Sequence, residues 1–168
     1  PLPEAQLDRF LMHVRIGYPE AGAEAEILRL ARLQARSSGA SAAGGEGVVV
    51  GQAEIFAARS AVLDIHMAPQ LERYLIELVL ATRGASEYGR GVASRIAYGA
   101  SPRGSIALDR CARAHAWLAG RDFVGPQDVH AVAADVLRHR VLLGFEAEAE
   151  GVSSDAVIAD LLDQVPLP

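Results

Sequence analysis

The segment Gly99-Ala100-Ser101-Pro102-Arg103-Gly104 places an arginine in the first turn of a predicted helix. Ser101 is a good N-cap and Pro102 suits the first helical position, which leaves Arg103 at the second. A cation at a helix start costs a few tenths of a kcal/mol, because that end already carries partial positive charge. A guanidinium beside the free N–H groups of a helix start is, however, suited to bind a phosphate. The alternative is that Arg103 points outward and pairs with a nearby carboxylate.

Other kinds of chemical site find little support in the residue pattern. The five histidines have no zinc-ligand spacing and there are no paired cysteines, so we expect no metal site. The single cysteine, Cys111, lies among apolar residues, and we expect a small buried thiol there. The alternating acids Glu146, Glu148 and Glu150 are interpreted as the solvated end of an extended segment rather than as a cation site.

The composition indicates a globular protein and argues against several classes of partner. The chain has 168 residues, 51% of them hydrophobic, which is enough to form a core. Its net charge of -5, from 16 basic and 21 acidic residues, argues against a nucleic-acid binder. No apolar stretch is long enough to span a bilayer and no signal peptide is visible, so we expect a cytoplasmic protein with no membrane span.

All 16 basic residues are arginines, and the chain contains no lysine. A phosphate-binding loop of the P-loop type requires a lysine after its glycines. The chain by itself is therefore predicted not to hydrolyse a nucleotide through such a loop.

The first residues predict a short helix and then a strand. Residues 3–9 have a proline early and an acid in the first turn, as a helix start prefers. Over residues 10–16 apolar side chains alternate with others, which is typical of a strand. A single strand is not stable alone, so this region resembles the end of a sheet-containing domain.

The rest of the chain predicts about six amphipathic helices. Residues 37–50 are small and rich in glycine, which indicates a flexible linker, and residues 84–99 are interpreted as a loop with a short extended piece at 94–98. Three- and four-residue spacings predict buried stripes on several helices. The stripes are Ile55, Ala58, Val62 and Ile65 on one helix; Leu71, Leu75, Leu78 and Thr82 on the next; Ala107, Cys111, Ala114 and Leu118 on the helix after Ser101; and Val129, Val132, Ala133, Val136 and Leu137 on the helix that Gly125 and Pro126 start. Arg138, His139 and Arg140 lie at the C-terminal end of the helix that Gly125 and Pro126 start, where the helix dipole favours positive charge.

Three stretches together resemble the MoxR family of AAA+ ATPases, relatives of magnesium-chelatase subunits. They are PLPEAQLDRFLMHVRIGYPE at the start, YLIELVLATR followed by YGASPRGSIALDRCARAHAWLAGRDFVGPQDV, and LRHRVLLGFEAEAEGVSSDAVIADLLDQVPLP at the end. The combination of LPEAQLDRF with GASPR is the most specific part. The resemblance covers nearly the whole chain apart from the small-residue linker.

The resemblance implies roles for two arginines. Arg9, in LDRF, resembles an arginine finger that points at the γ-phosphate bound by a neighbouring subunit. Arg103, in GASPR, resembles the sensor 2 arginine, which contacts the nucleotide of its own subunit. The resemblance also implies that Ser101 and Pro102 belong to the same nucleotide-binding site. The alternative for Arg9 is an ordinary ion pair with Glu4 or a structural contact under the strand.

The resemblance also implies an architecture and partners. Residues 1–19 would be the end of an α/β ATPase core and residues 20–168 a helical lid, so the fold would be mainly α. The phosphate loop would precede this chain, and the intact parent would use ATP and Mg²⁺ as a homo-oligomeric ring, commonly a hexamer. It would remodel or activate a client, for instance in cofactor or metal insertion, with a von Willebrand factor A-type partner. The alternative is a helical interaction module that works without nucleotide.

Overall fold

The structure is a computed structural model that describes residues 3–36 and 49–168. The chain divides into two compact units. One contains Ala57–Pro168 together with the N-terminal residues up to Val14, and the other is Arg15–Phe56. The predicted linker at 37–50 lies almost entirely outside the described residues.

The smaller unit contains helix α2 (Ala21–Arg36) and the first residues of α3 (Gln52–Asp64). Helix α2 agrees closely with the helix predicted from residue 23 to 36, with Glu24 in its first turn and Arg36 in its last. These charges suit the helix dipole at both ends. Neither α2 nor α3 has a buried residue, so neither contributes to a core within the described part of the chain.

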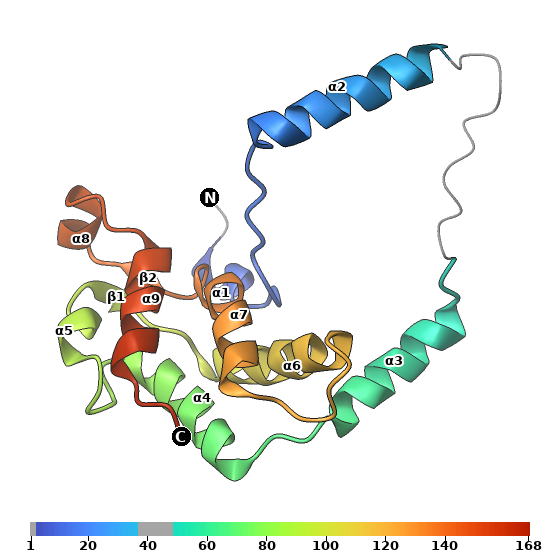
Figure 1. Cartoon of the computed structure of the whole chain (residues 1–168). Coiled ribbons are helices and arrows are strands. Elements are labelled where there is room, and N and C mark those ends of the chain that lie inside the picture. Colours follow the sequence, from blue (N-terminus) through green and yellow to red (C-terminus); the bar gives the residue numbers. More distant parts are fainter. Residues whose placement is uncertain (1–2, 37–48) are drawn as a thin grey trace. The chain divides into compact units, whose positions relative to one another are not determined.

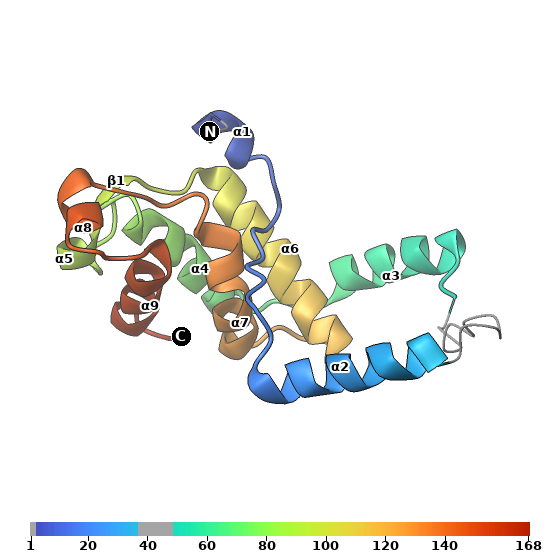
Figure 2. The ribbon, with the colours of Figure 1, turned by 90° about the horizontal axis from the view of Figure 1, so that it is seen from above.

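The larger unit is built around four helices, α4 (Pro69–Ala81), α6 (Pro102–Leu118), α7 (Pro126–Leu137) and α9 (Ser154–Gln164). Helix α6 packs against α4 and α7, while α9 packs against α4 and α7 (Figures 1 and 2). Three of these helices begin with proline at the first or second position, and α9 is capped by the Ser153 side chain. The mainly α fold expected from the sequence is therefore confirmed.

The core lies between these helices. Its largest fully buried side chains include Leu78 of α4, Leu108 of α6, Leu137 of α7, and Ile158 on α9. The stripes predicted for α4 and α7 are confirmed, because Leu71, Leu75 and Leu78, and Val129, Val132, Ala133, Val136 and Leu137, are all buried.

Two other predicted stripes are partly wrong. On α6, Ala107 and Cys111 are buried, but Leu118 is 77% exposed, and the buried face instead continues through Leu108, Ala112 and Ala116. On α3, Ile55 is 49% exposed, and Ile65, which is buried, lies just beyond the helix end. A periodic stripe shows which face of a helix is apolar, whereas burial also requires a neighbouring element over that face.

A small antiparallel sheet pairs β1 (Ile96–Tyr98) with β2 (Leu142–Leu143), and the short helices α5 (Arg90–Ala93) and α8 (Phe145–Ala149) lie near it (Figure 1). Strand β1 confirms the extended piece expected at 94–98, while α5 was not predicted. The acidic run Glu146, Glu148 and Glu150 is exposed, as expected, but its predicted extended conformation is wrong. It forms α8 rather than an extended end, since Gly144 starts a helical turn that buries Ala147 against the fold.

The short helix predicted over residues 3–9 is present as α1 (Glu4–Leu7), but the strand predicted over residues 10–16 is not formed. Backbone groups of this segment, which would pair with another strand in a sheet, instead form hydrogen bonds with residues in and just after the last turn of α7. Side chains of Arg140 and His139 bind the Phe10 carbonyl, and the His13 amide donates to the Asp135 carbonyl at 2.8 Å. A strand is stable only beside another strand, whereas the described neighbour of this segment is the C-terminal end of α7.

Candidate functional site

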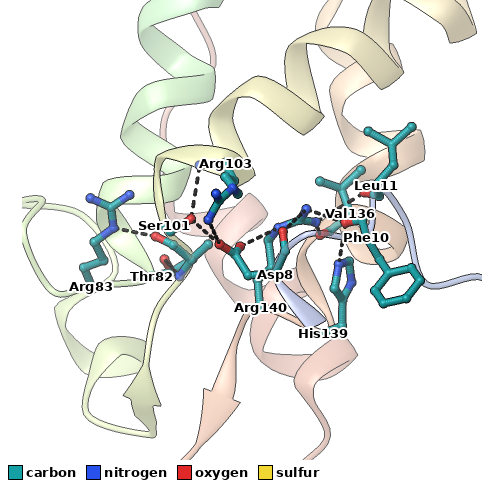
Figure 3. Close-up of polar contacts among 11 residues, drawn as sticks. Asp8, Phe10, Leu11, Thr82, Arg83, Ser101, Arg103, Val136, His139 and Arg140 are labelled. Atoms are coloured by element: carbon teal, nitrogen blue, oxygen red, sulfur yellow. Dashed lines mark hydrogen bonds and ion pairs between the residues drawn. The ribbon is translucent and has the colours of Figure 1, made fainter. Parts of the chain in front are cut away.

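The loop before α6 is anchored on the last turn of α4. The Thr82 hydroxyl accepts from the Ala100 amide at 3.0 Å, and Arg83 Nε donates to the Ala100 carbonyl at 2.5 Å (Figure 3). Gly99 allows this close approach, because a Cβ there would lie 2.3 Å from the Thr82 carbonyl oxygen. The start of α6 is therefore placed by backbone contacts with α4.

Ser101 is the N-cap of α6, as the sequence predicted. Its Oγ accepts from the Arg103 amide at 3.1 Å and donates to Asp8 Oδ2 at 2.8 Å. Pro102 occupies the first helical turn, where its missing N–H leaves no hydrogen bond unmade. One serine hydroxyl thus joins the start of α6 to a residue 93 positions earlier in the chain.

Arg103 lies at the protein surface beside this cap. Its side chain is 57% exposed, and Nη1 lies 3.6 Å from Asp8 Oδ2. The nearby-carboxylate alternative is thus realised, but only through a long pair. Exposed pairs of this kind contribute little free energy, so an anion with better geometry can displace it.

The Asp8 carboxylate contacts Ser101, Arg103 and Arg140. Burial by itself raises the pKa of this carboxyl, but hydrogen bonds from Ser101 and Arg140, the charge of Arg140 and the contact with Arg103 outweigh it and lower the pKa. Asp8 therefore stays ionised at neutral pH. It supplies the negative charge that the two guanidinium groups require in this site.

Arg140, at the end of α7, is the buried member of the site, with a side chain 2% exposed. Nε donates to Asp8 Oδ1 at 3.1 Å, and Nη2 donates to the carbonyls of Asp8 at 3.1 Å and Phe10 at 2.6 Å (Figure 3). Nη1 donates to Leu11 and Val136 carbonyls. Sequence reasoning missed this role, because Arg138, His139 and Arg140 were interpreted as helix-end charges. The signal in the sequence is that this basic run directly precedes the apolar residues 141–143, which indicates that part of the run is buried.

Arg9 is exposed, and its side chain makes no ion pair or hydrogen bond with any residue that the structure describes. The alternative pair with Glu4 is therefore not formed there. Its backbone amide donates to the Gln6 carbonyl at 3.2 Å, in the turn that ends α1. Arg103 contacts Asp8, the residue just before Arg9. The side chains of Arg103 and Arg9 are both exposed.

A cavity of about 310 Å³ adjoins the site and is lined by Asp8, Ser101, His139 and Arg140, with Glu4, Ala5 and Gly99. His139 is buried; its Nε2 lies 3.1 Å from the Phe10 carbonyl, while its Nδ1 has no hydrogen-bond partner in the described part of the chain. The lining includes the carboxylates of Glu4 and Asp8, and Arg103 is not part of it. No group of three metal-ligating side chains is present among the described residues.

Comparison with known proteins identifies the family of this chain. A family model described as the AAA lid domain matches residues 90–161, which run from α5 into α9 and include the whole of α6. The chaperone MoxR1 of Mycobacterium tuberculosis is 40% identical over 100% of this chain and 43% of its own length. The chain belongs to the MoxR family of AAA+ proteins. The protein MoxR of Paracoccus denitrificans is 34% identical over 99% of the chain and 51% of its own length.

A solved structure has the same fold over the whole of this chain. A crystal structure from Cytophaga hutchinsonii, assigned as an ATPase, superposes with a TM-score of 0.86 at 38% identity, covering 100% of this chain and 49% of that one. The chain thus spans about half the length of these MoxR relatives. In the part that the structure describes, no helix combines the length and apolar character needed to cross a membrane.

Proposed function

We propose that Arg103 of this MoxR-family chain senses bound nucleotide and that Arg9 acts on the nucleotide site of the neighbouring subunit in a ring. Arg103 would contact a phosphate of the nucleotide bound by its own subunit, and Arg9 would contact the γ-phosphate bound by the neighbouring subunit. The observation that carries the proposal is the Arg103 guanidinium itself, 57% exposed at a capped helix start and held only by a pair at 3.6 Å. A helix start and a guanidinium together attract phosphate.

The proposal extends to the whole protein. The parent would bind ATP and Mg²⁺ through a core of which residues 1–19 are the end, while residues 20–168 form the lid. It would work as a homo-oligomeric ring, with a hexamer as the expected size, in the cytoplasm. Hydrolysis would remodel a client, with a von Willebrand factor A-type protein as the expected partner; the name chaperone given to the Mycobacterium tuberculosis relative supports this class of activity.

The test uses the full-length protein, in which the nucleotide site is complete. ATP turnover and nucleotide affinity are measured for the wild type, Arg103→Ala and Arg110→Ala. Arg110 is an exposed arginine two turns further along α6 and serves as the matched control. We expect Arg103→Ala to lower turnover by about tenfold or more, or about 1.4 kcal/mol, and Arg110→Ala to keep wild-type turnover.

Circular dichroism and size-exclusion chromatography check that both variants fold and assemble. Unchanged turnover and affinity in a folded Arg103→Ala ring would contradict the phosphate-reading role. That result would favour the alternative of a helical interaction module that needs no nucleotide.

A further inference from the structure

Asp8, the residue before Arg9, is held by two different helices of the lid. Its Oδ2 accepts the Ser101 hydroxyl at 2.8 Å, at the start of α6. Its Oδ1 accepts Arg140 Nε at 3.1 Å, just after the end of α7 (Figure 3). Both carboxylate oxygens therefore have fixed partners, and each partner comes from a different element.

The backbone is held on both sides of Arg9. Arg140 Nη2 donates to the carbonyl of Asp8 at 3.1 Å and to that of Phe10 at 2.6 Å. His139 Nε2 also lies 3.1 Å from the Phe10 carbonyl. The residues before and after Arg9 are thus attached to the end of α7, whereas the Arg9 side chain between them is exposed.

Burial makes this attachment firm. The side chains of Arg140 and Asp8 are 2% and 16% exposed, so the pair is largely shielded from bulk water. Charge-assisted hydrogen bonds in such surroundings are stronger than exposed ones, and separating the two groups would leave a buried charge without a partner. The base from which Arg9 projects should therefore move with the lid.

We propose, building on the function proposed above, that Asp8 is a positioning residue for Arg9. Because Ser101 and Arg140 bind the Asp8 carboxylate, Asp8 attaches the segment that contains Arg9 to the lid of the same subunit. The lid thereby sets where Arg9 meets the phosphate of the neighbour. A lid that closes on its own nucleotide would carry this arginine with it.

Subunit mixing in the full-length protein tests the proposal. Each active interface requires Arg103 from one subunit and Arg9 from the next. Mixing equal amounts of Arg9→Ala and Arg103→Ala subunits should therefore restore about one quarter of the interfaces by chance, since a ring interface joins two different faces. Absence of this restoration, or full activity of Arg9→Ala alone, contradicts the proposed function itself and is seen before Asp8 is tested.

Asp8→Asn keeps the size of the side chain and removes its charge. As a homogeneous ring it should lose turnover by about tenfold or more while nucleotide affinity stays within about threefold of wild type, because its own Arg103 remains. Mixed with Arg103→Ala it should regain activity, and mixed with Arg9→Ala it should not. That pattern assigns Asp8 to the same role as Arg9.

Three results would overturn the proposal. Restoration with Arg9→Ala but not with Arg103→Ala would mean that Asp8 serves Arg103. Restoration with neither partner would mean that Asp8 only supports the fold, and wild-type turnover of the Asp8→Asn ring would mean that it has no role. If Asp8→Asn rings do not assemble, Arg140→Gln is tested in the same mixtures with the same expected pattern. Asp160→Asn, which removes an exposed partner of Arg95, is the matched control and should keep wild-type turnover.

Discussion

Gly99 lies so close to Thr82 that a Cβ on the glycine would be 2.3 Å from the Thr82 carbonyl oxygen. The contact is with backbone at the end of α4, which cannot move aside without breaking the turn. The next residue, Ala100, is bound to the Thr82 hydroxyl at 3.0 Å. Two consecutive residues of the GASPR segment therefore fix the start of α6 against α4.

We expect Gly99→Ala to lower the free energy of unfolding by about 2 kcal/mol, because the added methyl group overlaps the Thr82 backbone. Gly91→Ala is the matched control: nothing lies within 4 Å of a Cβ there, and the residue is within a helical turn. This control should be neutral or stabilising by up to about 1 kcal/mol. Urea unfolding followed by circular dichroism measures both. Equal midpoints for the two variants would show that the α4 end can shift.

The buried pair of Arg140 with Asp8 gives a second prediction. Arg140→Met keeps an apolar stem but leaves Asp8 without its buried partner and several carbonyl groups without a donor. Removing one partner of a buried pair is strongly destabilising, and we expect a loss of about 3 kcal/mol in the free energy of unfolding.

The control for this change is Arg95→Met, whose pair with Asp160 is about half exposed on both sides. We expect a loss below about 1 kcal/mol for that variant. A similar loss in both variants would show that burial of Arg140 does not strengthen its contacts. Chemical denaturation, with the slope checked for each variant, gives the comparison.

Much of the fold follows from local signals in the sequence. Ser101 and Pro102 start α6 as their residue types favour, and Pro126 does the same for α7. The apolar spacing of α4 and α7 also identifies their buried faces. These features depend on neighbours within a few residues, so a sequence pattern reports them directly.

The features that were missed depend on contacts between distant residues. The alternation over residues 10–16 indicated a strand, but its backbone is bound by residues about 130 positions later, such as Arg140 to Phe10. Nothing in a local pattern identifies that partner. For the same reason the sequence predicted Arg103 as a candidate and did not reveal that Asp8 lies between it and Arg140.

His139 should make stability depend on pH. Burial lowers the pKa of its imidazole below the ordinary 6.5; the Phe10 carbonyl opposes this shift, while the charge of Arg140 adds to it. The unfolded chain therefore binds a proton before the folded one does. The free energy of unfolding should fall as the pH drops below about 6.5, by at most about 1.4 kcal/mol per pH unit for this one group, until the folded pKa is reached.

His139→Gln removes this titration and keeps a polar side chain. Urea midpoints of wild type and variant are compared from pH 7.5 to pH 5. The wild-type curve should fall more steeply below about pH 6.5 than the variant curve. Parallel curves throughout this range would show that His139 is protonated equally in the folded and unfolded states.

Two leucines of α6 give the last prediction. Leu108 is 0% exposed and Leu118 is 77% exposed, although the sequence spacing placed Leu118 on the buried stripe. Leu108→Ala removes core contacts with no water to replace them, and we expect a loss of about 3 kcal/mol in the free energy of unfolding. Leu118→Ala should change it by less than about 0.5 kcal/mol, because the side chain is already hydrated. Comparable losses at both positions, measured by urea unfolding of the same chain, would mean that Leu118 is covered in solution.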